Sequence, residues 1–490
     1  MSENNIIAQR RSESWREDLR KSMKAKERAA IERVHMNELD PGYRRRNNEE
    51  VNLGLTSEQA MCEAQRCLDC ADPTCMKGCP VGINIPTFVK HIEKGEFLDA
   101  ARILKETSAL PAVCGRVCPQ EKQCEANCVY TQKMGKDAVA VGYLERFAAD
   151  YERESGQMSV PETAPKNGVK IAVVGSGPAG LAFAGDMAKL GYDITVFEAL
   201  HEVGGVLKYG IPEFRLPNKI VDVEVDILRK MGVEFINDCI IGKTLSYDDL
   251  HDMGFKGIFV GSGAGLPRFM GIPGENLNGV MSSNEYLTRV NLMDAANPES
   301  DTPVFLGKKV AIIGGGNTAM DSVRTAVRLG AERAMIVYRR SEEEMPARIE
   351  EVKHAKEEGV EFLTLNNPVA YIGDDKGRVV KMILQKMELG APDASGRRSP
   401  VEIVGATEEI DVDQVIVSVG VSPNPLIPSS IDGLQVSKWG TVVVNQESMQ
   451  SDVKDLFAGG DIVRGGATVI LAMGDGRNAA AHMHEYLMQK

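Results

Sequence analysis

Eight cysteines near the N-terminus, arranged in two groups of four, constrain the fold more than any other feature of this sequence. The spacings are C-x2-C-x4-C-x3-C in the first group and C-x3-C-x5-C-x3-C in the second. The members are Cys67, Cys70, Cys75 and Cys79, followed by Cys114, Cys118, Cys124 and Cys128. In a cytosolic chain, cysteines grouped this closely bind metal more often than they form disulfides. The sequence therefore predicts an N-terminal unit folded around bound metal.

Iron–sulfur clusters explain these spacings better than zinc does. Zinc modules usually use Cys-x2-Cys pairs separated by a longer finger, often with histidine ligands. The nearest histidine, His91, lies outside both groups. Pro80 follows Cys79 as in bacterial ferredoxins, where the fourth cysteine ligates the other cluster. Because zinc is redox-silent, it also fits poorly with the dinucleotide motifs that follow.

A glycine-rich loop begins at Gly175 and has the pattern G-x-G-x-x-G, completed by Gly177 and Gly180. It follows a predicted buried strand, 169–174, and opens a predicted helix that runs to residue 190. In this context the glycines permit a tight turn, close approach to a pyrophosphate and close helix–strand packing. Glu198 ends the next predicted strand, where a carboxylate accepts hydrogen bonds from a ribose. The unit therefore predicts a dinucleotide site.

A second copy of this strand–turn–helix unit spans 309–337. Its loop runs from Gly314 through Gly316, Asn317 and Thr318 to Ala319, the G-x-G-x-x-A variant. In place of an acid after the second strand it has Arg339 and Arg340. Arginine pairs well with phosphate oxygens, and NADPH carries the 2′-phosphate that NADH lacks. We therefore predict NADPH at this loop; the alternative is that both arginines are ordinary surface charges.

The C-terminal tail provides the rest of the first dinucleotide site. A predicted strand leads into Gly459, Gly460 and Asp461, a sequence suited to the ribityl and phosphate end of FAD. We therefore assign FAD to the first loop. The expected fold class is α/β, with an N-terminal helical iron–sulfur domain followed by two interleaved Rossmann-like domains. The expected boundaries are 1–165 for the helical domain, 166–280 with 441–490 for FAD, and 281–440 for NADPH.

The charge and hydropathy patterns exclude several functions. A net charge of −13 argues against nucleic acid as a partner. The sequence contains no apolar run of about 18 residues, so no membrane span is expected, and the polar N-terminus indicates a cytoplasmic protein. The charged run from Arg16 to Arg33 predicts solvated helical arms, and apolar spacing predicts helix across 88–107.

These motifs together resemble the small (β) subunit of NADPH-dependent glutamate synthase. The matching segments are 67–80, 114–119, 175–180, 204–217, 314–321, 338–346 and 458–461. The architecture is similar to that of the large subunit of bifurcating ferredoxin:NADP⁺ oxidoreductases and the N-terminal half of dihydropyrimidine dehydrogenase. The resemblance implies FAD, NADPH and two 4Fe-4S clusters.

The resemblance also implies particular site residues. One cluster would use Cys67, Cys70, Cys75 and Cys128, and the other Cys79, Cys118, Cys124 and Glu145. The residues alone would favour Cys114 for the last position, because thiolate is the commoner ligand. The complete set expected to bind FAD is Gly175, Gly177, Pro178, Ala179, Gly180, Glu198, Gly204, Gly205, Val206, Arg215, Gly460, Asp461, Ala467 and Thr468.

The implied function is transfer of electrons from NADPH through FAD to the clusters, as the small subunit of glutamate synthase. Glutamate would form from glutamine and 2-oxoglutarate on a large partner subunit. No side chain is assigned as catalytic, because hydride transfer requires no acid or base. One alternative is the NADP(H)- and FAD-binding subunit of a bifurcating oxidoreductase, acting with ferredoxin and a small flavin or iron–sulfur partner. Another is a non-catalytic zinc-binding scaffold.

Overall fold

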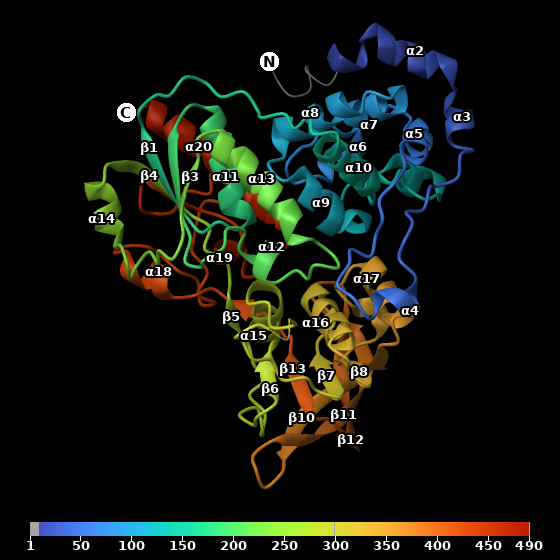
Figure 1. Ribbon diagram of the computed structural model, residues 1–490, viewed down its shortest axis with the longest axis vertical. Helices are drawn as coiled ribbons and strands as arrows, with labels where there is room; N and C mark the ends of the chain where they lie inside the picture. Colours follow the sequence, from blue (N-terminus) through green and yellow to red (C-terminus); the bar gives the residue numbers. More distant parts are fainter. Residues whose placement is uncertain (1–8, 298, 490) are drawn as a thin grey trace.

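A computed structural model describes residues 9–297 and 299–489 of the chain. Figure 1 shows a helical N-terminal unit beside a unit built on one sheet, with a second sheet unit extending below both. The predicted fold class is therefore confirmed.

Short helices form the N-terminal unit. They are α2 (Ser14–Ser22), α3 (Ala25–Arg28), α4 (Pro41–Arg44), α5 (Ser57–Gln65), α6 (Thr74–Lys77), α7 (Ile85–Lys94), α8 (Phe97–Thr107), α9 (Pro111–Val117) and α10 (Val141–Glu154). The helix expected across 88–107 is two helices, α7 and α8. The break occurs because Gly95 ends α7 in the left-handed conformation, with φ of 84°.

The first sheet contains the first glycine loop and is entirely parallel. Its strand order is β15 (Leu456–Ala458), β4 (Phe255–Val260), β1 (Lys170–Val174), β2 (Asp193–Phe197) and β3 (Glu234–Ile236). The helices that accompany it are α11 (Pro178–Lys189), α12 (Val206–Tyr209), α13 (Asn218–Lys230), α14 (Tyr247–Asp252), α18 (Leu426–Ser430), α19 (Asp461–Arg464) and α20 (Val469–Met488). β15 therefore brings the C-terminal tail to the edge of this sheet.

The second sheet repeats this plan around the second loop. Its order is β6 (Val280–Ser282), β13 (Gln414–Val417), β7 (Lys309–Ile313), β8 (Arg333–Tyr338) and β9 (Glu361–Thr364). Its helices are α15 (Ser283–Leu287), α16 (Asn317–Arg328) and α17 (Ile349–Glu357). In both sheets the strand before the glycine loop is central, so the internal duplication is present in three dimensions.

Two antiparallel elements complete the second unit and its connection. A three-stranded sheet is formed by β10 (Asn366–Gly373), β11 (Val379–Pro392) and β12 (Arg398–Asp411). A two-stranded ribbon of β5 (Leu266–Pro267) and β14 (Val421–Ser422) pairs segments that lead into and out of the second unit.

The arginine run near the N-terminus is not solvated as expected. Arg16 and Arg28 are each only 2% exposed. Arg16 pairs with Asp69, and Arg28 pairs with Glu93 at 2.8 Å. The charge pattern was misleading because the carboxylates that neutralise these arginines lie far along the chain.

A buried carboxylate, Glu358, joins the N-terminal unit to the second sheet unit. Its two oxygens accept five hydrogen bonds at 2.7–3.1 Å from Arg44, Arg324 and Arg328. Burial opposes ionisation of Glu358, but the arginine donors outweigh it and lower its pKa to about 2. The position of the second sheet unit against the helical unit therefore depends on a charged side chain with no exposed surface.

Candidate functional site

A cavity of about 1040 Å³ lies between the two glycine loops. This volume is at the upper limit of the roughly 300–1,000 Å³ typical of ligand pockets, as expected for a site that accepts dinucleotides. From the set predicted for FAD, its lining includes Gly175, Gly177, Pro178, Ala179, Glu198, Gly205, Val206, Arg215, Gly460, Asp461, Ala467 and Thr468. Gly180 and Gly204 do not line it.

The first loop leads directly into helix α11. Gly177 is the N-cap and Pro178 the first helical residue, so the first-turn N–H groups at the cavity wall have no partner within the helix. Such an end favours a phosphate. A Cβ at Gly180 would lie 2.0 Å from the carbonyl oxygen of Gly175, so this position excludes any side chain.

Glu198 holds the first loop from the end of β2. One carboxylate oxygen accepts hydrogen bonds from the backbone N–H of Ser176 at 2.9 Å and from its hydroxyl at 2.5 Å. The other accepts from the N–H of Leu200 at 2.9 Å. A carboxylate has about four acceptor positions, so Glu198 can orient the loop and still accept from a ribose hydroxyl.

The tail closes the opposite side of the cavity at the start of α20. Thr468 caps this helix, and Asp461 accepts the backbone N–H of Ala467 at 2.8 Å. Asp475 accepts the N–H of Gly460 at 3.0 Å and pairs with Arg464 at 2.6 Å. The Gly460–Asp461 turn is thus fixed by contacts within the tail itself.

Arg215 lines the cavity but is already paired across it. Its guanidinium donates to both oxygens of Asp321 at 2.6 and 2.7 Å and lies 3.2 Å from Glu351. Burial raises the pKa of Asp321 to about 6, against the lowering effect of Arg215. Since Asp321 lies on α16, this ion pair ties the flavin-side segment to the second glycine-loop unit.

The second loop opens onto the same cavity. Asn317 and Thr318, at the start of α16, line it, whereas Gly314, Gly316 and Ala319 do not. Gly314 has φ of 141°, and a Cβ there would lie 2.3 Å from the Ser418 carbonyl oxygen. The loop therefore requires glycine at this position.

The two arginines after β8 have different surroundings. Arg340 is buried and donates to Asp393 at 2.7 Å and to the carbonyl oxygen of Arg398 at 2.8 Å. Arg339 is exposed, and within the described ranges it forms no ion pair. Arg339 is therefore the more available of the two for a phosphate.

The cysteines gather in two sets that cross between the sequence groups. Cys67, Cys70, Cys75 and Cys128, here called the outer set, surround a small cavity of about 30 Å³. Burial raises the pKa of Cys75 well above its usual value, and the neighbouring Cys67, Cys128 and Cys70 raise it further. Four thiols that share one pocket match the donor set of an iron–sulfur cluster.

The inner set consists of Cys79, Cys118, Cys124 and Glu145. Burial raises the pKa of Cys124, and the charges of Cys79, Cys118 and Glu145 contribute to the increase. Glu145 is 5% exposed, and one of its carboxylate oxygens has no hydrogen-bond partner. A buried unpaired oxygen is costly unless it has a ligand role, so this residue fits the fourth position of a cluster.

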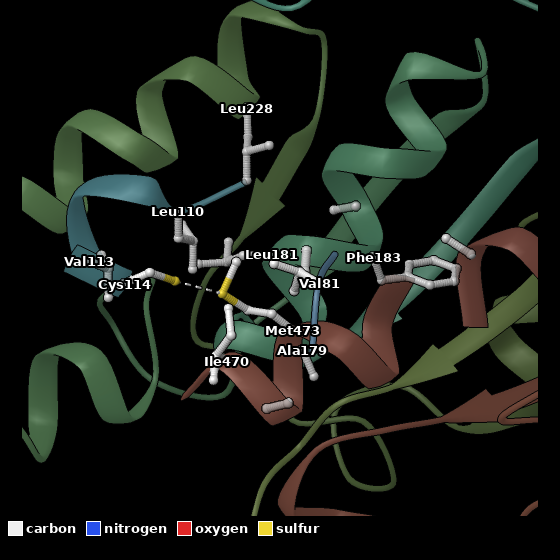
Figure 2. Packing of buried hydrophobic residues seen from close by; sticks show 14 of the residues in the cluster. Val81, Leu110, Val113, Cys114, Ala179, Leu181, Phe183, Leu228, Ile470 and Met473 are labelled. Carbon is white, nitrogen blue, oxygen red and sulfur yellow. Dashed lines mark hydrogen bonds between the residues drawn. The ribbon is translucent and has the colours of Figure 1, made fainter. Parts of the chain in front are cut away.

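Cys114 lies beside the inner set but faces another element. Its thiol donates to the sulfur of Met473 at 3.5 Å, across the contact between α9 and α20 (Figure 2). It is fully buried among apolar side chains, including Val113 and Leu110. A hydrogen bond with Cys118, together with burial, raises the pKa of Cys114 well above its usual value, so Cys114 also lies within contact of the inner set.

The inner set adjoins the flavin-side cavity. Val117 and Pro119, the two residues that flank Cys118, both line that cavity. The outer set does not contribute to its lining. The arrangement therefore runs from the dinucleotide cavity to the inner set and then to the outer set.

Sequence reasoning missed several of these wall residues. The turn after β4, from Gly261 to Gly265, lines the cavity. Its glycine-rich composition directly after a buried strand was a usable signal. Asp321 and Val117 had no such signal, because their place in the wall depends on how separate units pack.

Comparisons with known proteins place this architecture in a family. A domain model described as dihydropyrimidine dehydrogenase domain II, 4Fe-4S cluster, matches residues 44–157. A model described as pyridine nucleotide-disulphide oxidoreductase matches residues 169–476. The glutamate synthase (NADPH) small chain of Azospirillum brasilense is 35% identical over 91% of this chain and 93% of its own length. This chain belongs to the glutamate synthase small-chain family.

Other relatives of the family are consistent with this assignment. The NADPH-Fe(3+) oxidoreductase subunit beta of Geobacter sulfurreducens is 35% identical over 88% of this chain and 66% of its own length. Among solved structures, Mycobacterium tuberculosis FprA has a TM-score of 0.56 and 19% identity, covering 66% of this chain and 85% of its own. Lactococcus lactis thioredoxin reductase has a TM-score of 0.51 and 21% identity, over 66% of this chain and 100% of its own. The solved structures support the fold alone.

As a member of the small-chain family, this chain is an NADPH-dependent oxidoreductase that uses FAD and 4Fe-4S chemistry. The family predicted from the motifs is thereby confirmed. In the part of the chain that the structure describes, every helix is too short or too polar to cross a lipid bilayer.

Proposed function

We propose that this chain takes electrons from NADPH and delivers them to a large partner subunit that forms glutamate from glutamine and 2-oxoglutarate. The observation that carries the proposal is the shared cavity. Both glycine loops open onto it, and the neighbours of Cys118 form part of its wall. The named glutamate synthase small chains, which match along nearly their whole length, support the choice of product.

The proposal assigns the cofactor sites as follows. FAD is assigned to the fourteen residues named for it above, twelve of which line the cavity. NADPH is assigned to Gly314, Gly316, Asn317, Thr318, Ala319, Arg339 and Arg340, of which Asn317 and Thr318 line the cavity. One 4Fe-4S cluster is bound by the outer set and a second by the inner set. The proposed domain boundaries are 1–165, 166–280 with 441–490, and 281–440, although α18, within the last range, packs with the first sheet unit.

The protein contributes binding and position rather than acid–base chemistry. Bound FAD would supply the chemistry that links a two-electron hydride donor to one-electron acceptors such as iron–sulfur clusters. Gly177 and the first turn of α11 orient the pyrophosphate, and Glu198 orients a ribose. The Arg215–Asp321 pair joins the 204–217 segment to α16 at 2.6 Å, which fixes the second dinucleotide unit against the first. Val117 and Pro119 exclude water between the cavity and Cys118.

The test combines the purified chain with a glutamate synthase large subunit, NADPH, glutamine and 2-oxoglutarate under nitrogen. We expect glutamate well above the amount formed by the large subunit alone. Cys118→Ala should abolish this increase while NADPH still reduces the flavin. Cys62→Ser, which changes an exposed thiol outside both sets, is the matched control and should behave as the wild type. No glutamate above the large-subunit background would refute the proposal.

A second candidate is the NADP(H)- and FAD-binding subunit of an electron-bifurcating ferredoxin oxidoreductase. The relatives that favour it include the Geobacter NADPH-Fe(3+) oxidoreductase beta subunit and the NADP(+)-dependent formate dehydrogenase beta subunit of Moorella thermoacetica. Reduction of ferredoxin and NAD⁺ together, in the presence of a small flavin partner, would support this candidate over the first.

A further inference from the structure

The segment from residue 9 to residue 28, here called the arm, lies against the loop that carries the outer set. It contains α2 and α3 and precedes the iron–sulfur domain match, which begins at residue 44. Figure 1 shows α2 along the outer side of the helical unit. The arm is therefore an addition to the part of the chain that the domain model describes.

Asp69 is the residue of the outer-set loop that the arm contacts. It lies between Cys67 and Cys70, is fully buried, and adopts the left-handed conformation with φ of 51°. This conformation is uncommon for any residue other than glycine. A buried charge in a strained turn requires partners to hold it.

Three arginines of the arm provide those partners. Arg16 and Arg20 donate to different oxygens of the Asp69 carboxylate, Arg20 at 2.5 Å. Arg11 donates to the Asp69 carbonyl oxygen at 2.9 Å. Arg16 also donates to the Thr87 hydroxyl at 2.9 Å, which fixes the guanidinium against α7.

A second anchor holds the other side of the same turn. The ammonium of Lys90 donates to the Cys67 carbonyl oxygen at 2.6 Å and pairs with Glu93. Arg28 of the arm pairs with that same Glu93 at 2.8 Å. The arm thus contacts the outer-set turn directly at Asp69 and reaches Cys67 only through Glu93 and Lys90.

We propose that the arm is a clamp that positions the Cys67–Cys70 turn and tunes the cluster of the outer set, with Arg16 and Arg20 as positioning residues that act through Asp69. This inference rests on the proposed function for the presence of that cluster. Two guanidiniums against one carboxylate leave net positive charge beside the site. Positive charge favours the reduced, more negative cluster and raises its reduction potential. The same contacts hold the Cys67–Cys70 turn in place, so a cluster bound there should be lost more slowly in air when they are present.

The test uses the full-length chain, reconstituted with iron and sulfide under nitrogen. Arg16→Gln and Arg20→Gln are compared with Arg10→Gln, which removes an ion pair of the same arm with Glu106 at 2.8 Å, away from the turn. The readouts are the midpoint potential of each cluster from a titration followed by electron paramagnetic resonance, and the rate at which each cluster bleaches in air. NADPH reduction of the flavin is measured in parallel.

For Arg16→Gln and Arg20→Gln we expect one cluster to show a lower midpoint potential. The same cluster should bleach at least about fivefold faster, because the lost hydrogen bond to Asp69 contributes about one kcal/mol or more. The other cluster, flavin reduction and Arg10→Gln should match the wild type, and Arg16→Lys should recover part of the potential. Arg20 is partly exposed, so its variant tests the idea even if Arg16→Gln fails to fold. If the midpoint potentials and bleaching rates of Arg16→Gln and Arg20→Gln equal those of the wild type, the clamp proposal is overturned and the proposed function is not. If the wild-type protein does not bind two 4Fe-4S clusters, the proposed function is overturned.

Discussion

Replacing Glu358 with glutamine should weaken the whole molecule more than any exposed charge change. The carboxylate accepts five hydrogen bonds from three buried arginines. Glutamine has one acceptor oxygen, and its NH₂ group would face guanidiniums that also donate. Removing one partner of a buried ion pair typically costs about 3–5 kcal/mol of unfolding free energy.

The pKa of Glu358 gives a second, independent estimate of how much its charge contributes to the free energy of unfolding. The pKa of Glu358 falls from the usual value of 4.5 to about 2, and this shift corresponds to about 3 kcal/mol of unfolding free energy at neutral pH. Because the pKa is lower in the folded state, this stability is present above pH 4.5 and is lost as the pH falls toward 2. The difference between wild type and Glu358→Gln should shrink over the same range.

Urea unfolding of the reconstituted protein, followed by circular dichroism at pH 7 and at pH 3, measures both effects. The control is Glu357→Gln, the preceding residue, whose side chain is 33% exposed and pairs with Arg44 at 2.6 Å. Because the Glu357 carboxylate reaches solvent while its partner Arg44 is buried, losing this pair should cost less than losing Glu358. The reasoning fails if Glu358→Gln is no less stable than Glu357→Gln at pH 7, or if the gap between them is as large at pH 3 as at pH 7.

Three further predictions concern the cofactor sites. Gly180→Ala should lose bound FAD, because the added Cβ would lie 2.0 Å from the carbonyl oxygen of Gly175. Flavin content per chain after gel filtration measures this loss, and full flavin occupancy would contradict the prediction. Arg339→Ala should raise the KM for NADPH roughly tenfold, about 1.4 kcal/mol, and leave that for NADH unchanged in steady-state assays. Arg340→Ala should instead lower the melting temperature, since Arg340 is held by Asp393. Glu145→Ala should reduce the iron content toward one cluster per chain, whereas Cys114→Ala should leave it unchanged. Loss of iron in Cys114→Ala but not in Glu145→Ala would identify Cys114 as the ligand.

The sequence was sufficient to predict the two strand–turn–helix units, because the chemistry of each is local. The glycine pattern and the apolar runs that flank it, which are the buried strands themselves, lie close together in the sequence, and the carbonyl oxygen that excludes a Cβ at Gly180 belongs to Gly175 of the same turn. The family resemblance rests on these same local motifs. The site residues assigned from them remain predictions until the experiments above are done.

The charge patterns were less informative because their partners are distant in sequence. Arg16 appeared to be a surface residue until Asp69 was seen to face it, and Arg340 pairs with a carboxylate 53 residues away. Arg215 was expected to face only the flavin, yet its closest contacts are on the other dinucleotide unit. Spacing along a helix indicates which face a side chain occupies, but not which element covers that face.

The helix α20 has a consequence for how the protein is made. Its first turn lines the dinucleotide cavity, Met473 contacts Cys114, and a Cβ at Gly474 would lie 2.9 Å from the carbonyl oxygen of Pro80, beside the inner set. A ribosome synthesises residues 469–488 after every other part of these two sites, so both remain open while the rest of the chain emerges. Flavin and iron–sulfur insertion can therefore be completed only after translation has passed this helix. A nascent chain stalled before it would expose cysteines that the finished protein encloses.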